Sequence, residues 1–563
     1  MEGDDARASV SRHVQYNKIL NRGLVLPQEL CWLVVQELAD HEDFNSLFHC
    51  AQASRGLANL ALPLLYSFHE SSPASNAHIL FTETLVCLWR SIISSSMGGT
   101  LYPYCRWIKT LQLTALHSFL DDLARENGTR RAQFFSPPLH KLQIRKDRGL
   151  NLDAIVITMA DMVIKSIKAA ADEEDKVVGL TTLDAHRLPN ANLPSWVADL
   201  SRLITLMVGD GEVLNASVAE AIRANCPSFN ELVCYSCRNG DVQLAAFFRA
   251  LAPNTLESFT IRSTNDIGAE TFRALSRHAL SLNRLRLFSL EQSALESLHN
   301  LSDCLGLKSL TLEANFQATR FAWENTSKKS LEDVTLWLRQ CTSLKDLEFR
   351  LVPNSATILA DVLKTPEIRL TSLYINLVDV NDAFYTSLAC QHDLRHLKVL
   401  INDEDLLEVA ETRHALFADS ICSCTKLREL NTNELFTLED VTKIVAAVPN
   451  LEDLRLDGDR FDDDFLKPLS SLLHLKQLFV FGFSIFSFEG LLNFLARLSI
   501  DGRENHEGLQ ISIENQAWDV MLSEKEERWL TRDIEEFFGG RLDIIYRNDP
   551  DELHESDFSD FSD

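Results

Sequence analysis

The chain has 563 residues, and its 81 acidic against 54 basic side chains give a formal net charge of −27. Nucleic-acid binders need a basic footprint, and anionic membranes repel acidic surfaces, so this charge argues against both kinds of partner. No apolar run approaches the roughly 20 residues that span a bilayer. The polar N-terminus MEGDDARASV is unlike a signal peptide, so we expect a soluble protein of the cytoplasm, the nucleus or both.

Residues 1–22 form a short polar lead, and residues 23–67 predict three short helices. The first helix is expected to open at Pro27, where a missing N–H costs nothing. Asp43 stands where the N-cap of the second helix belongs. The third helix carries leucines at helical spacing and is crossed by Pro63. A unit of about 45 residues is too small to bury all its apolar side chains, so its apolar face calls for a partner.

The opening LPQEL, the centre DFNSL and the closing ASRGLANLALPLLYS of this stretch resemble fungal members of the F-box family. F-boxes dock the Skp-type adaptor of cullin–RING ubiquitin ligases, and the resemblance implies the same partner here. The alternative is an ordinary helical cap on the domain that follows. By match to the F-box pattern, the expected adaptor-binding residues are Leu26, Pro27, Leu30, Val34, Leu38, Phe44 and Leu47. Gly56 and Leu57 replace a bulkier pair of the family, a departure that would weaken the adaptor contact.

Residues 68–105 read as a linker followed by a connecting helix, and residues 106–546 carry a recurrent L-x-x-L-x-L phrase. Examples are WIKTLQL from Trp107, LHKLQI from Leu139, LTTLDA from Leu180 and LKQLFV from Leu475. From Leu180 on, most copies follow one another after 23 to 27 residues, which is the period of leucine-rich repeats. We therefore predict an α/β fold, a horseshoe-shaped solenoid with a concave parallel sheet and outer helices.

The solenoid is expected to end in a cap. Leu509–Ile513 and Leu542–Tyr546 predict closing strands, and a charged helix over Ser523–Phe538 lies between them. Long insertions interrupt the repeats at Asn315–Ser330 and Ile401–His414. Residues 547–563 form an acidic tail without strand pattern, which we expect to be disordered and solubilising. Its serines precede acids, so the alternative is a target for acid-directed kinases.

Cys234 and Cys237 have the spacing of half a metal site or of a redox pair. The repeat register favours a different interpretation, because both fall on recurrent positions of the repeat. Other cysteines lie three residues before a strand's first apolar residue, namely Cys226, Cys304, Cys341 and Cys424, and Cys390 lies four before. We expect buried structural thiols. No nucleophile elbow, phosphate-binding loop or zinc-protease helix occurs, so we expect no catalysis, no cofactor and no metal.

Side chains alternate along a strand, so the residues between the buried leucines should face the concave side. Arg262, Arg284 and Arg286 then lie on adjacent strands and would bind an acidic or phosphorylated peptide. The alternative is that Glu313 and Glu348 neutralise them. Phe479 and Phe481 are either exposed substrate anchors or core residues covered by the closing strands.

Together these features resemble an F-box protein with leucine-rich repeats. The resemblance implies a substrate-recognition subunit of a Skp–cullin–F-box ubiquitin ligase, whose concave face binds a target protein. A non-degradative F-box scaffold is the alternative. A remote alternative is a GTPase-activating protein, because the Ran GTPase-activating protein also joins such repeats to an acidic tail.

Overall fold

The computed structural model describes residues 27–67, 83–125, 128–146, 149–174, 179–185, 190–315, 328–377, 382–401, 413–500, 503–515 and 521–546. The chain divides into two compact units, the first comprising Met1–Tyr235 and Ala250–Ala252, the second Ser236–Arg249 and Pro253–Asp563. The predicted lead, tail and linker centre, together with Leu26 and most of both insertions, lie outside the described residues.

The first unit begins with three helices, α2 (Gln28–Asp40), α3 (Phe44–Ala53) and α4 (Arg55–Ser67). Pro27 occupies the N-cap of α2, so this helix starts one residue later than expected. Asp43 caps α3 as predicted, because its carboxylate accepts a hydrogen bond from the backbone N–H of Ser46 at 3.0 Å. The helices share a small core, made by Val35, Ala39, Leu47 and Ala61.

Tyr66 at the end of α4 links these helices to α6 (Glu83–Ser96). Its hydroxyl lies 2.6 Å from the hydroxyl of Ser91, and burial raises the pKa of Tyr66 to about 12. The Tyr66 ring also packs against Tyr104, with ring centroids 4.6 Å apart. These contacts belong entirely to the first unit, and they attach α4 to the segment that precedes the repeats.

The remainder of the first unit holds an irregular helical stretch followed by the first regular repeats. Strand β1 (Thr110–Gln112) pairs in parallel directly with β4 (Thr182–Ala185). The prediction of a sheet strand at Leu139 is therefore wrong: a 3-10 helix, Leu139–Leu142, forms there. The other elements of this unit are α7 (Leu113–Arg125), α8 (Thr129–Phe134), β2 (Arg145–Lys146), β3 (Gly149–Leu150), α9 (Leu152–Glu174), α10 (Leu193–Asp199), β5 (Thr205–Asp210), α11 (Ala216–Asn225) and β6 (Glu231–Ser236).

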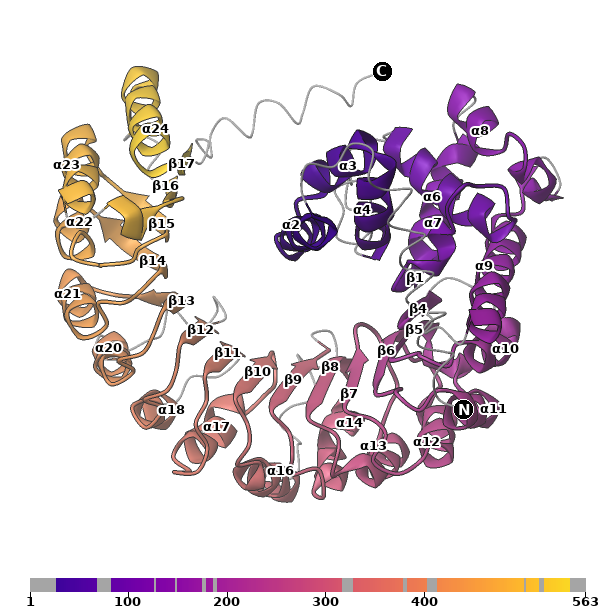
Figure 1. Cartoon of the computed structure of the whole chain (residues 1–563). Coiled ribbons are helices and arrows are strands. Elements are labelled where there is room, and N and C mark those ends of the chain that lie inside the picture. Colours follow the sequence, from indigo (N-terminus) through magenta and orange to yellow (C-terminus); the bar gives the residue numbers. More distant parts are fainter. Residues whose placement is uncertain are drawn as a thin grey trace, which may run out of the picture. The chain divides into compact units, whose positions relative to one another are not determined.

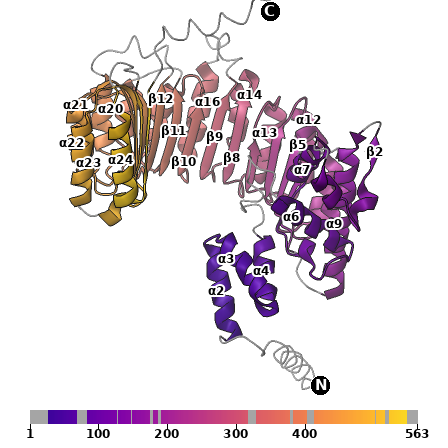
Figure 2. The same cartoon turned by 90° about the horizontal axis from the view of Figure 1, so that it is seen from above.

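The second unit is a leucine-rich-repeat solenoid, with strands on its inner side and helices on its outer side (Figure 1). Its strands follow one another in sequence order, and Figure 2 shows β8 to β12 running side by side. The strands are β7 (Ser258–Ile261), β8 (Arg284–Leu290), β9 (Ser309–Ala314), β10 (Asp346–Arg350), β11 (Ser372–Leu377), β12 (His396–Ile401), β13 (Glu429–Leu435), β14 (Asp453–Phe461), β15 (Gln477–Ser484), β16 (Gln510–Asn515) and β17 (Arg541–Tyr546).

Helices connect these strands, which makes each pair of neighbours parallel. They are α12 (Asp241–Ala250), α13 (Ala269–Leu275), α14 (Gln292–Glu296), α16 (Lys328–Gln340), α17 (Ser355–Leu363), α18 (Asp382–Leu388), α20 (Arg413–Cys422), α21 (Leu438–Ala447), α22 (Asp463–Leu469), α23 (Phe488–Ile500) and α24 (Glu524–Phe538). Both closing strands and the intervening helix form close to the predicted positions. Ser523 caps α24 through a capping box with Glu526.

Aligned registers stack equivalent leucines from strand to strand, as in Leu285↔Leu310 and Leu310↔Leu347. These leucines are almost fully buried between the strands and the helices. Each repeat therefore covers the apolar edge of its neighbour, which is how a solenoid obtains one continuous core.

The cysteine positions belong to this repeat packing. Cys226, Cys304, Cys341 and Cys424 are buried and reduced, and burial raises the pKa of each thiol to about 12. The expectation fails at Cys390, which is exposed. Gln391 takes the buried place instead, three residues before Leu394, and donates to the carbonyl of Leu363 at 2.7 Å. The shift by one residue explains the difference, because this position must satisfy carbonyl oxygens of the preceding repeat.

Candidate functional site

Helix α2 exposes an apolar stripe. Leu30, Leu33 and Val34 are 45 %, 53 % and 52 % exposed, and their i, i+3, i+4 spacing places them on one face of the helix. Pro27 is exposed at the start of the same helix. Large apolar side chains grouped in this way on a small bundle mark a protein-interaction surface.

The other predicted adaptor residues lie deeper. Leu38 and Phe44 are half-buried, and Leu47 is 1 % exposed within the three-helix core. Leu47 therefore supports the bundle from inside and offers no surface to a partner. The spacing of the sequence pattern could not separate the two roles, because helix-facing and partner-facing leucines are alike in type.

Three exposed apolar residues were not among the predicted site residues. Leu33 lies between Leu30 and Val34 on the stripe, and Trp32 and Phe48 are about half exposed on α2 and α3. The helical repeat of α2 was the signal that could have found Leu33. We define the α2 stripe as Leu30, Leu33 and Val34.

The inner side of the second unit follows the predicted alternation, although exposure varies along it. On β8, Arg284 and Arg286 are exposed and Phe288 is half-buried, while Leu285 and Leu287 are buried. Short polar side chains on the neighbouring strands are buried despite facing the same side, namely Ser258, Thr260, Ser309 and Thr311. The strand register explains their burial, because each short side chain is paired with a longer side chain on β8 or β10, which covers it.

The two β8 arginines, which we call the arginine pair, have no ion-pair partner among the described residues. The alternative, neutralisation of these arginines by Glu313 and Glu348, is not what the geometry favours. Both carboxylates engage Arg350 instead, with Glu348 at 2.5 Å and Glu313 at 3.5 Å from its guanidinium. Arg262 is exposed one strand before the pair and does have an interaction of its own.

Phe479 and Phe481 fit neither sequence alternative completely, because both are half-buried on β15. The guanidinium of Arg455 lies over the Phe479 ring, 4.0 Å from its centroid. Strands β16 and β17 continue the sheet beyond these residues and do not fold over them. Phe483, on the same strand, is 50 % exposed.

Cys234 and Cys237 are both buried and reduced, as the repeat register predicts. Within the described ranges, no group of three or more histidine, cysteine, aspartate or glutamate side chains is placed to hold a metal ion. The helices in those ranges are also too short or too polar to cross a membrane.

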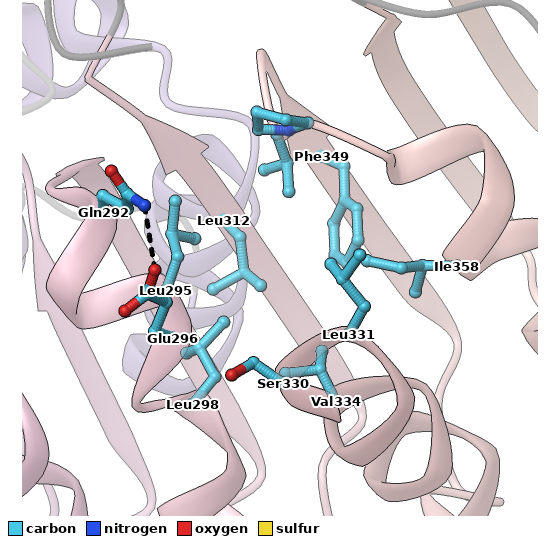
Figure 3. Close-up of a pocket in the computed structure, with 12 residues that line it drawn as sticks. Gln292, Leu295, Glu296, Leu298, Leu312, Ser330, Leu331, Val334, Phe349 and Ile358 are labelled. Carbon is cyan, nitrogen blue, oxygen red and sulfur yellow. Dashed lines mark hydrogen bonds between the residues drawn. The ribbon is translucent and has the colours of Figure 1, made fainter. Parts of the chain in front are cut away.

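A cavity opens behind the sheet between α14, α16 and α17, and Figure 3 shows the side chains that line it. Its walls are mainly apolar, with Leu312 and Phe349 on the strands, and Gln292 donates to Glu296 at 2.8 Å on its rim. The space measures ≈ 30 Å³, about one water molecule's share of liquid volume. Small-molecule sites are roughly ten times larger, so this is a packing gap.

No protein-family model matches the chain, and the comparison with curated proteins finds no similar sequence. Among solved structures, the chain is similar to one in a TLR13–ssRNA13 complex, with a TM-score of 0.32 and 13 % identity over 61 % of this chain and 54 % of that one. It thus matches about half the length of that protein. It is also similar to a chain of the yeast Rad7–Elc1 complex, with a TM-score of 0.32 and 12 % identity over 66 % and 92 % of the two chains.

Proposed function

We propose that this protein is a substrate-recognition subunit of a Skp–cullin–F-box ubiquitin ligase. In this function, α2 to α4 form an F-box that docks a Skp-type adaptor, and the inner side of the second unit holds a target protein. The observation that carries the proposal is the α2 stripe. A bundle that buries Leu47 and leaves Leu30, Leu33 and Val34 exposed has an apolar surface with no partner among the described residues.

The energetics favour a partner at this stripe. Removing apolar surface from water contributes roughly 25 cal/mol per Å², and the three side chains are each about half exposed. The adaptor would also explain why so small a bundle keeps several large apolar residues on its surface. If the stripe only capped the next domain, these side chains would be covered by the first unit itself.

The contribution of the protein would be proximity and orientation, with no bond chemistry of its own. Its inner surface would present the arginine pair to an acidic or phosphorylated segment of the target. A non-degradative F-box scaffold would use the same two surfaces. Measuring the turnover of the bound target distinguishes the two functions, because only the ligase subunit would increase it. We expect the protein to act in the cytoplasm or the nucleus.

Co-purification with a recombinant Skp-type adaptor tests the proposal. We expect the wild-type chain to retain the adaptor and a Leu30→Asp/Val34→Asp variant to lose it. Both positions are exposed, so the variant should remain folded. A matched control is Gln28→Asp, which introduces the same kind of charge at an exposed position of α2 on the side of the helix opposite to the stripe. If the folded wild type failed to bind, the three helices would be a cap and the protein a free-standing repeat scaffold.

A further inference from the structure

A second cationic site lies on the inner side of the second unit, four to six strands beyond the arginine pair. Lys398 on β12, Asn431 on β13 and Arg455 on β14 stand in one row, because Lys398 pairs in register with Asn431 and Asn431 with Arg455. Tyr374 and Phe479 close this row at its two ends. We call Lys398, Asn431 and Arg455 the lysine–arginine site.

The polar groups of this site are incompletely satisfied. The Lys398 ammonium lies over the Tyr374 ring, 4.6 Å from its centroid, and has no carboxylate partner among the described residues. The Nε of Arg455 and the Oδ1 of Asn431 are shielded from solvent, and neither has a hydrogen-bond partner in the described part of the chain. Asp457 forms an ion pair with Arg455, 3.7 Å from the same Nε, which is too long for a hydrogen bond, so Lys398 is the cation of this site without a carboxylate partner in the described ranges. Burial and the positive charges of Arg455 and Arg350 lower the pKa of Lys398.

The stretch between the two cationic sites has a different character. Arg350 is held between Glu313 and Glu348, and its guanidinium lies 5.4 Å from the Phe288 ring and 4.9 Å from the Tyr374 ring. Its charge is thereby compensated, and one carboxylate remains in excess. An anion would gain little here, whereas an apolar or neutral segment could pack on the two rings.

We propose that these two cationic sites bind one protein segment at two anionic positions, with a neutral or apolar stretch between them. The inference rests on the proposed function, because it describes the target that the inner surface holds. Five strand intervals separate β8 from the centre of the lysine–arginine site, or roughly 24 Å at about 4.8 Å per strand. An extended segment covers about 3.3 Å per residue, so the two anionic groups should lie about seven residues apart.

The target segment is acidic or phosphorylated rather than basic. Guanidinium groups bind phosphate and carboxylate oxygens through paired donors, and both guanidinium groups of the arginine pair are on exposed side chains. The row nearest the strand starts is acidic at Asp346, Glu429 and Asp453. Arg286 and Lys398 stand in one register row across the strands, so we place both anionic groups of the target on this row.

Fluorescence anisotropy with the full chain tests this inference. The probes are labelled glycine–serine peptides with two phosphoserines about seven residues apart, with two adjacent phosphoserines, or with one. Two linked sites act at a high effective concentration only when the linker spans them. We expect the spaced peptide to bind at least about tenfold more tightly than the other two. Equal affinity of the spaced and adjacent peptides would overturn the proposal.

Variants locate the binding. Arg286→Gln and Lys398→Met should each reduce the spaced peptide to the affinity of the single phosphoserine peptide. Arg339→Gln, an exposed position on the outer helix α16, removes the same charge and should leave binding unchanged. The two sites would be refuted if the Arg339→Gln control lost binding. They would also be refuted if Arg286→Gln and Lys398→Met bound the spaced peptide as tightly as the wild type. A single-stranded RNA of equal charge that binds as tightly through Arg286 and Lys398 would refute a protein target.

Adaptor binding and peptide binding are independent readouts, because the peptide assay needs no adaptor. A chain that binds the adaptor but ignores phosphoserine spacing would contradict only this inference. A chain that binds the spaced peptide but no adaptor would contradict only the proposed ligase function.

Discussion

Glu434 is a buried carboxyl group whose environment opposes its ionisation. It is 2 % exposed and belongs to an irregularity in the pairing of β13 with β14. One oxygen accepts from the Tyr385 hydroxyl at 3.5 Å, and the other has no partner among the described residues. Burial raises its pKa, and Arg413 and His414 nearby only partly oppose this effect. The ionised form is therefore less stable in the folded chain than in water.

We predict that Glu434→Gln raises the melting temperature at neutral pH. A carboxyl whose folded-state pKa is raised stabilises the fold below its unfolded-state pKa and loses that contribution as pH rises through the folded-state value. The gain from the neutral amide should therefore be largest near pH 7 and shrink toward about pH 4, near the ordinary pKa of glutamate. Thermal unfolding across this range measures it, and Glu439→Gln on exposed α21 surface is the control. A gain that grows as pH falls would contradict the assignment.

The thiols provide a second prediction at this scale. Brief alkylation of the folded protein near pH 8 should modify the exposed Cys87 and Cys390 and spare the four buried cysteines of the repeats. The reason is twofold: the thiolate is the reactive form, and the pKa of each buried thiol is about 12. Peptide mass mapping reads out the sites. Fast labelling of Cys341 in the folded chain would contradict its place in the core.

Helix α2 uses two faces for two purposes. Val35 and Ala39 are buried against α3 and α4, while the α2 stripe remains exposed. Substitutions on the buried face should therefore reduce stability, and substitutions on the exposed face should reduce adaptor binding.

We predict that Leu47→Ala destabilises the three-helix bundle by about 2–4 kcal/mol, because a large side chain leaves a cavity in a small core. Val34→Asp should leave stability within about 0.5 kcal/mol, since exposed substitutions change it little, and should abolish adaptor binding. Hydrogen exchange of α2 to α4, measured beside adaptor binding, separates the two effects. Equal loss of protection in both variants would show that Val34 belongs to the core.

The sequence pattern predicted where most helices and strands lie, but it did not predict which of their apolar residues are buried and which are exposed. The repeat period located the strands of the second unit, because the equivalent leucines of successive strands must all be buried where the strands stack. It failed at Leu139, where the same letters form a 3-10 helix, since a short L-x-x-L phrase also fits one helical turn. It also could not separate Leu47 from Leu33, because burial depends on how three helices pack.

At the scale of the whole molecule, the sequence indicated an acidic chain with a few cations on its inner strands. It placed Arg262, Arg284 and Arg286 on the concave side, and the structure leaves all three exposed, but it missed the lysine–arginine site. Lys398 and Arg455 lie 57 positions apart in the chain, and only the register of three strands brings them into one row. The alternative that Glu313 and Glu348 neutralise the three arginines overlooked Arg350 for the same reason, because Arg350 stands beside both carboxylates.

The central claim is that the chain joins a ligase through the α2 stripe, and calorimetric titration of the full chain with a Skp-type adaptor tests it most directly. We predict saturable binding with one adaptor per chain and a negative heat-capacity change, the mark of buried apolar surface. Leu33→Asp should remove the binding heat, while Gln28→Ala, at an exposed position on the opposite side of α2, should retain it. A folded wild-type chain that releases no heat with the adaptor, or a Leu33→Asp variant that binds it normally, would contradict the account.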